Sequence, residues 1–165
     1  MKKYVVVILL FLVVITGCGK QGLPKQIGNQ DGLVLVYEDS NISVVNSPTY
    51  RISLYNDKRI ISEYSEQGNS YIINLSEEDY QKILETAFSE KFLDLDKNIT
   101  SIETEGGSNY SITLYYNGKT FTTGGQNIEE KEFTKLQELL VNLVKAEEEK
   151  MNSKGDNEKN EGIVS

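Results

Sequence analysis

The fold of this chain is decided by the stretch Tyr50-Arg51-Ile52-Ser53-Leu54-Tyr55. Its first, third and fifth side chains are large and apolar, and its second and fourth are polar. A period of two is that of a β-strand with one buried face. The stretch therefore predicts a half-buried strand whose other face carries Arg51, Ser53 and Tyr55.

Further strands extend from this one through turns. Asn56-Asp57 has the composition of a turn, residues 59–64 return as a hairpin partner, and residues 70–74 form a third strand. The same pattern recurs at Tyr110-Ser111-Ile112-Thr113-Leu114-Tyr115. Asn117-Gly118 follows it, which is a strong hairpin signal, and residues 119–123 form the return strand.

A helical pattern follows each of these hairpins. Ser76 is suited to cap the first helix, and Asn127 is the candidate cap of the second. The apolar residues then recur at helical spacing on one face. They are Tyr80, Ile83, Leu84, Ala87 and Phe88 in the first helix, and Phe133, Leu136, Leu140 and Val144 in the second.

Together these elements predict an α+β domain, an antiparallel sheet with two helices on one face. The two β-β-α halves have two explanations, which the sequence leaves open. One is an internal duplication. The other is that two hairpin-helix units look alike because the same physics shapes both.

The remaining segments set the domain boundaries, with the α+β domain at residues 33–146. Residues 33–37 read as a strand, 39–41 as a turn and 42–45 as another strand. Residues 18–32, rich in glycine and polar residues, predict a flexible linker. Residues 147–165 are highly charged and predict a disordered tail, with the preceding helix ending near Met151.

The N-terminus carries a motif with a specific chemical meaning. Lys2 and Lys3 precede an uncharged apolar run, Tyr4–Ile15, which is too short to span a bilayer and has the form of a signal-peptide core. It ends in Ile15-Thr16-Gly17-Cys18, which resembles the bacterial lipoprotein signal. The body resembles small uncharacterised cell-envelope lipoproteins.

That resemblance implies a location. Residues 1–17 would be removed as a signal peptide, and Cys18 would become a lipidated N-terminus on the outer face of a bacterial cell membrane. Two acyl chains hold a protein stably, so the anchor on Cys18 would suffice.

The net charge of the chain limits the classes of molecule that it can be expected to bind. The chain has a formal net charge of −8, and loss of Lys2 and Lys3 with the leader would take it to −10. Nucleic acid requires a basic footprint, so it is not an expected partner. The expected contacts are the membrane, through Cys18, and a cell-envelope protein.

The residue types present exclude several chemistries. There is no histidine, so histidine-dependent catalysis and histidine metal sites are ruled out, and the lone cysteine, Cys18, would carry lipid. Asp94, Asp96, Asn98 and Glu105 superficially match a calcium loop, but Ile99 stands where the sharp turn needs glycine. We therefore expect no catalytic residue, metal or cofactor, and no enzyme.

What remains is a contact surface. Arg51, Tyr55 and Tyr115 would lie on the open face of the sheet, and Glu103 and Glu105 in a loop at residues 94–109. Tyrosines among small polar residues suit a contact surface. The sequence thus predicts a non-enzymatic binding or interaction module. The alternative is an inhibitor or immunity-type protein that blocks a cell-envelope enzyme through a protruding loop at residues 98–109. A carboxylate-based hydrolase is a third hypothesis and ranks last.

Overall fold

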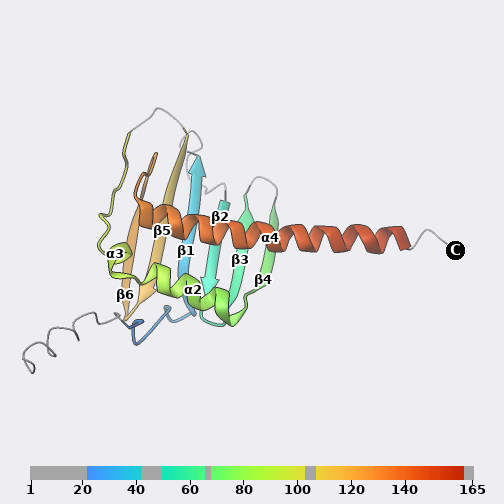
Figure 1. Ribbon diagram of the computed structural model, residues 1–165, viewed down its shortest axis with the longest axis horizontal. Helices are drawn as coiled ribbons and strands as arrows, with labels where there is room; N and C mark the ends of the chain where they lie inside the picture. The colour runs from blue at the N-terminus through green and yellow to red at the C-terminus, as the bar shows by residue number, and fades with distance from the viewer. Residues whose placement is uncertain (1–21, 42–49, 66–67, 103–106, 162–165) are drawn as a thin grey trace, which may run out of the picture.

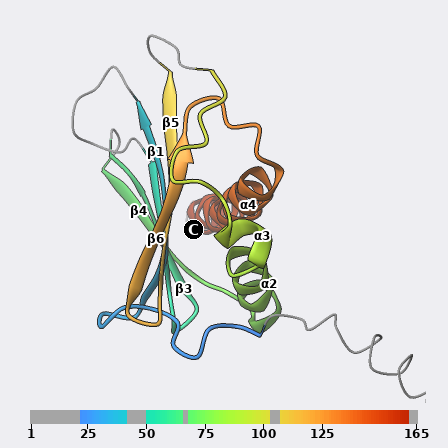
Figure 2. The ribbon, with the colours of Figure 1, turned by 90° about the vertical axis from the view of Figure 1, so that its left-hand side faces the viewer.

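The computed structural model describes residues 22–41, 50–65, 68–102 and 107–161. They form a six-stranded antiparallel sheet of order β4-β3-β2-β1-β5-β6, with the helices packed on one face (Figures 1 and 2). The predicted fold class is confirmed. The elements are β1 (Leu33–Asn41), β2 (Tyr50–Tyr55), β3 (Arg59–Tyr64), β4 (Asn69–Asn74), α2 (Glu77–Ala87), α3 (Glu90–Leu93), β5 (Ser108–Tyr116), β6 (Lys119–Gly125) and α4 (Lys131–Glu161).

Strand β1 is the centre of the sheet and sets which residues share a face. Tyr37 lies opposite Ile52 in β2 and opposite Ile112 in β5. Residues opposite one another in an antiparallel pair point to the same face. Ile52 and Ile112 are fully buried beneath the helices, so the predicted alternation of the two repeated stretches is confirmed.

Both predicted helices form, and their apolar stripes face the sheet. The Ser76 hydroxyl oxygen accepts a hydrogen bond from the backbone N–H of Asp79 at 3.1 Å, which caps α2. The predicted stripe of α4 is completely buried, with no exposed surface on Phe133, Leu136, Leu140 or Val144. Burial of such a stripe is the main source of helix stability in a protein.

The two predicted halves, the first of which has an additional strand, β4, before its helix, have opposite handedness. Strands β2 and β5 both run antiparallel to β1, but β3 lies outside β2 on one side and β6 lies outside β5 on the other. Because both helices cover the same face, the halves are related as mirror images. A duplicated unit would keep its handedness, so this arrangement favours shared physics over duplication.

Two segment predictions near β1 differ from the structure. Asp39-Ser40-Asn41, predicted as a turn, forms the last part of β1 and pairs with β5, and Asp39 also pairs with Tyr50 of β2. Pairing on both sides overrides the turn preference of these residues. The predicted strand at residues 42–45 lies outside the described residues.

The predicted linker is ordered over its second half. The backbone N–H of Gly28 donates to the carbonyl oxygen of Tyr115 at 2.8 Å, and Ile27 forms a bridge with Tyr116. The Asn29 side-chain oxygen accepts from the backbone N–H groups of Asp31 and Leu33, both at 3.0 Å. These bonds fix residues 26–33 against the end of β5, so a flexible linker up to residue 32 is wrong for this part.

Helix α4 is also longer than predicted. Its backbone continues to Glu161, so residues 147–161 are not the disordered tail that the sequence predicted. An ion pair between Lys150 and Glu147, one turn apart, supports this extension. Figure 1 shows α4 crossing the sheet and continuing past β4.

Candidate functional site

The predicted contact residues of the sheet share the face without helices, but two of them, Arg51 and Tyr55, are already engaged. The Arg51 guanidinium donates to the Glu38 carboxylate, with the Nε bond at 3.0 Å, and this bond raises the pKa of Arg51. The Arg59 guanidinium lies 5.4 Å from the centre of the Tyr55 ring, within range of a cation–π contact. Tyr115 is half-buried on the same face. Their role in binding stays a prediction.

The described part of the predicted protruding loop, residues 98–102, packs against β6 and the segment that follows it. The Ile99 N–H donates to the carbonyl oxygen of Gly124 at 2.9 Å, and the Asn127 side-chain amide donates to that of Ile102 at 2.7 Å. Residues 98–102 therefore run beside β6 and do not project. Glu103 and Glu105 lie outside the described residues.

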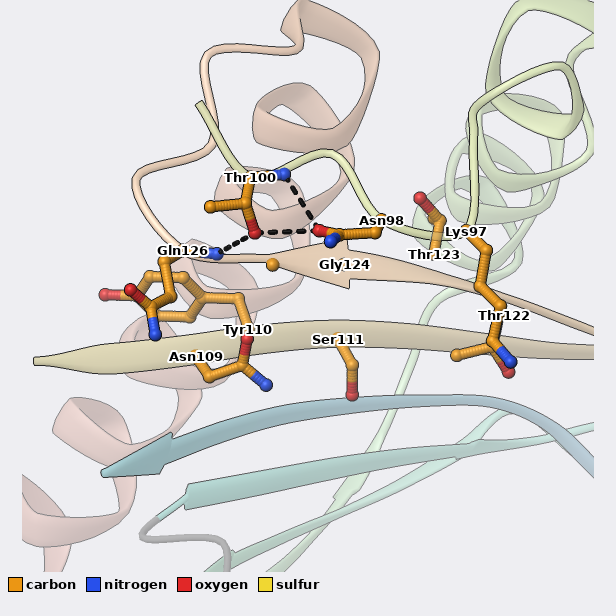
Figure 3. Close-up of a pocket in the computed structure, with 11 residues that line it drawn as sticks. Lys97, Asn98, Thr100, Asn109, Tyr110, Ser111, Thr122, Thr123, Gly124 and Gln126 are labelled. Carbon is orange, nitrogen blue, oxygen red and sulfur yellow. Dashed lines mark hydrogen bonds between the residues drawn. The ribbon is translucent and has the colours of Figure 1, made fainter. Parts of the chain in front are cut away.

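A shallow hollow opens beside this segment, which we call the edge pocket (Figure 3). Its volume is about 490 Å³. Asn98 Oδ1 accepts from the N–H of Thr100 at 3.1 Å and from its hydroxyl at 2.7 Å, and the Gln126 N–H donates to that hydroxyl at 3.0 Å. Lys97 is the one charged residue among those described in its lining. These side-chain polar groups already bond one another, so the pocket presents no convergent set aimed at a ligand.

A second hollow lies between the sheet and α4, and we call it the tyrosine cleft. Its volume is about 420 Å³, within the range of small-molecule sites. Four strands each contribute a tyrosine to it. Its lining consists of Tyr37, Asp39, Tyr50, Tyr64 and Tyr110 from the sheet and Gln137, Glu138, Val141, Asn142 and Lys145 from α4.

The four tyrosine rings form one connected cluster. Tyr37 meets Tyr50 edge to face with ring centres 6.2 Å apart, and Tyr50 stacks on Tyr64 at 4.6 Å. Tyr110 lies nearly parallel to Tyr37 at 6.5 Å. Such contacts add to the stability that burial supplies and hold the rings in fixed orientations.

Helix α4 is tied to this cluster by hydrogen bonds. The Gln137 side-chain amide donates to the Tyr37 hydroxyl at 3.0 Å. The Glu148 carboxylate accepts from the Ser62 hydroxyl at 2.8 Å and from the Tyr64 hydroxyl at 3.1 Å. These bonds fix α4 over the sheet, so both walls of the cleft belong to rigid elements.

One hydroxyl of the cluster, that of Tyr50, is not fully satisfied. The Tyr50 hydroxyl is sealed from solvent; among the described residues it interacts with the Tyr64 hydroxyl, but not in standard hydrogen-bond geometry. A buried polar group without a partner costs free energy, typically about 1–3 kcal/mol.

Burial keeps these hydroxyls protonated. It raises the pKa of Tyr37 to about 12, and it raises the pKa of Tyr50, where the neighbouring Tyr64 and Glu148 act in the same direction. It also raises the pKa of Tyr64. At neutral pH the cleft therefore offers neutral phenol groups, which both donate and accept hydrogen bonds.

Sequence reasoning placed Tyr50 on the buried face but did not recognise the cleft. The cluster depends on strand register, which sets Tyr50 opposite Tyr64 and Tyr110 opposite Asp39. The available signal was that Tyr50 and Tyr64 stand at strand ends and Tyr110 near one, where an aromatic ring reaches the rim of a core. Tyr37 lies in the middle of β1 and gave no such signal.

Other features of the described residues limit the chemistry that can be assigned. They contain no group of three or more acidic or cysteine side chains placed to hold a metal ion. None of their helices has the length and apolarity needed to cross a bilayer. Comparisons with known protein families, with curated proteins and with solved structures find no match to this chain.

Proposed function

We propose that this protein is a non-enzymatic binding module, held by lipid on Cys18 at the outer face of a bacterial membrane, and that the tyrosine cleft is its ligand site. The observation that carries the proposal is a preformed cleft of about 420 Å³ walled by four tyrosines from four strands. Preformed hollows of this size with aromatic walls and a few polar groups are the usual form of ligand sites.

This site suits binding better than inhibition through a loop. The inhibitor alternative needs a projecting segment, and residues 98–102 lie against β6. The open face of the sheet is less suited, because Arg51 is already paired with Glu38.

The lining favours an uncharged ligand, and we propose a saccharide chain. Asp39, Glu138 and Lys145 give the cleft a mixed rim, and the whole chain is acidic, so anions are disfavoured. Tyrosine rings can pack on the C–H faces of a sugar ring. The Asn142 amide and the phenol hydroxyls can bond its hydroxyl groups.

Tyrosine fluorescence provides the test, because the chain has ten tyrosines and no tryptophan to mask them. We expect titration with short oligomers of N-acetylglucosamine to change the emission of the wild-type protein. Tyr110→Ser should weaken this binding about tenfold, which corresponds to about 1.4 kcal/mol.

Tyr115→Ser is the matched control, since Tyr115 lies on the same strand, is also half-buried and points to the opposite face. It should bind as the wild type does. Loss of binding in Tyr115→Ser with Tyr110→Ser unaffected would move the site to the open face. No response to the oligomers at any concentration would refute a saccharide ligand.

The anchor has its own test. Cys18→Ser should leave the precursor uncut or release the chain from membranes, because serine has no thiol to form the thioether. The measurement is phase partitioning in detergent together with the mass of the N-terminal peptide. A Cys18→Ser protein that is still acylated at that position and membrane-bound would show the lipoprotein assignment to be wrong.

A further inference from the structure

The segment before β1 is bonded to the end of the sheet at which β5 turns into β6. The Gln26 N–H donates to Asn117 Oδ1 at 3.1 Å, and the Asn117 N–H donates to the carbonyl oxygen of Gln26 at 2.9 Å. Ile27 continues this contact by bridging to Tyr116. Figure 1 shows the segment below the strands, at the end of the sheet where β1 begins. We call this end, with residues 22–32 and the β5–β6 turn, the tether end.

The tyrosine cleft lies toward the opposite end of the strands. Asp39 lies opposite Tyr50 in β2 and opposite Tyr110 in β5. Tyr50 in turn lies opposite Tyr64, so these residues form one row across four strands. Along β5 this row is six residues from Tyr116, which corresponds to about 20 Å in a strand. The cleft and the tether end are therefore separated by most of the length of the sheet.

The chain between Cys18 and the tether end is short. Cys18 precedes Gln26 by eight residues. Eight residues reach at most about 29 Å when fully extended, and as a flexible chain they span about 16 Å. Strand β1 is itself about 27 Å long. Turning the cleft toward a bilayer that holds Cys18 would therefore require an almost fully extended tether, which is costly in conformational entropy.

Two exposed side chains at the tether end suit contact with a lipid surface. Leu23 is 38% exposed, and Lys25 is also exposed. An apolar side chain can enter the membrane interface, and a lysine can keep its ammonium group among the headgroups while its stem lies on apolar surface. Both residues lie between Cys18 and Gln26, where the chain must approach the bilayer.

From these observations we infer that the tether end faces the bilayer and that the tyrosine cleft lies on the side of the protein away from it. This inference rests on the proposed lipid on Cys18. It deepens the proposed function, because a saccharide chain then reaches the cleft from the side distal to the membrane.

Quenching of a fluorescent label by lipid tests this orientation. Lys119, at the tether end, and Asn109, beside the cleft end of β5, are both exposed, and each is replaced by cysteine in the full chain. A thiol-reactive dye labels only the new cysteine, because the Cys18 thiol carries the lipid. The lipidated proteins are purified from membranes and inserted into phosphatidylcholine vesicles doped with a lipid whose headgroup carries a nitroxide quencher.

We expect the Lys119→Cys label to be quenched at least about fivefold more than the Asn109→Cys label. Lys119 lies opposite Tyr116, so the two labelled positions are about 23 Å apart along the strands, and a nitroxide quenches only over short distances. Circular dichroism of both proteins checks that the substitutions leave the fold intact.

A lengthened tether provides the matched control. Insertion of about twelve Gly-Ser residues between Gly22 and Leu23 leaves Gln26 and its bonds unchanged but lets the domain turn over. The two labels should then be quenched to within about twofold of each other. A quenching ratio that the insertion does not change would show that the tether does not set the orientation, and it would overturn the inference.

Flotation of the vesicles distinguishes a wrong orientation from a wrong anchor. The labelled proteins should float with the vesicles, and Cys18→Ser should not. Floating proteins with equally quenched labels, or with the Asn109→Cys label quenched more strongly, would overturn the orientation and leave the anchor standing. Proteins that carry no lipid and do not float would overturn the anchor and this inference together.

Discussion

Raising the pH from about 10 to about 12 is expected to remove about 2 kcal/mol of folding free energy through Tyr37 alone. Tyr37 is 2% exposed, and the pKa of its phenol is raised from 10 to about 12, mainly by burial. A difference of one pKa unit corresponds to about 1.4 kcal/mol. The contribution is fully present below pH 10, where the phenol is neutral in both folded and unfolded chains.

The sign follows from proton binding. Between the two pKa values the folded chain keeps the Tyr37 proton and the unfolded chain loses it, so stability falls as pH rises. Tyr50 and Tyr64, whose pKa values are also raised, act in the same direction. The fall in folding stability with rising pH should therefore be steeper than the ionisation of one tyrosine can produce.

Urea unfolding across this pH range, followed by circular dichroism, measures the effect. Tyr37→Phe should show a shallower fall, because one of the linked protons is gone, although it also loses the bond from Gln137. A wild-type midpoint that is the same at pH 9 and pH 12 would contradict the burial of the tyrosine cluster.

Gly124→Ala should cost more than about 3 kcal/mol or prevent folding. A Cβ at this position would lie 2.8 Å from the Ser111 Cα and closer still to the carbonyl oxygen of Tyr110. Both are backbone atoms of the neighbouring strand β5, so no rotamer change relieves the contact. Crowding of a well-packed site commonly costs about 1–3 kcal/mol, and backbone obstruction raises that cost.

The free energy of unfolding in urea checks this result, with soluble yield as a second readout. Gly22→Ala is the matched control, since an added Cβ there meets nothing within 4 Å. It should leave stability within about 0.5 kcal/mol of the wild type, as is usual for surface substitutions. A Gly124→Ala protein as stable as the Gly22→Ala protein would mean that β5 and β6 do not approach as closely as described.

The fold was predictable because period and capping are local signals. The alternation at residues 50–55 and 110–115 fixed which side chains are buried, and the stripe of α4 fixed the face that packs on the sheet. These signals depend only on residues close together in the sequence, so they can be recognised without knowing which elements pack against each other.

The errors came from interactions between distant parts of the chain. The glycines of residues 18–32 read as a linker, but Gly28 bonds Tyr115 and Asn29 closes its own turn. Asp39 has the composition of a turn residue, but β2 and β5 both pair with it. The charged residues after Ala146 lack an apolar stripe, but Glu148 bonds two residues of β3.

The tyrosine cleft was not predictable for the same reason. Its four rings come from four strands, and they meet only because the register brings Tyr50 opposite Tyr64 and Tyr37 between β2 and β5. The sequence drew attention instead to Tyr55 and Tyr115, because their pattern repeats.

The most direct test of the central claim is the NMR spectrum of ring-labelled tyrosine with and without oligomers of N-acetylglucosamine. A ligand in the cleft should shift the signals of Tyr37, Tyr50, Tyr64 and Tyr110 together and leave those of Tyr55 and Tyr115 in place. Shifts confined to Tyr55 and Tyr115, or no shift in the four cleft tyrosines at saturating oligomer, would contradict the account.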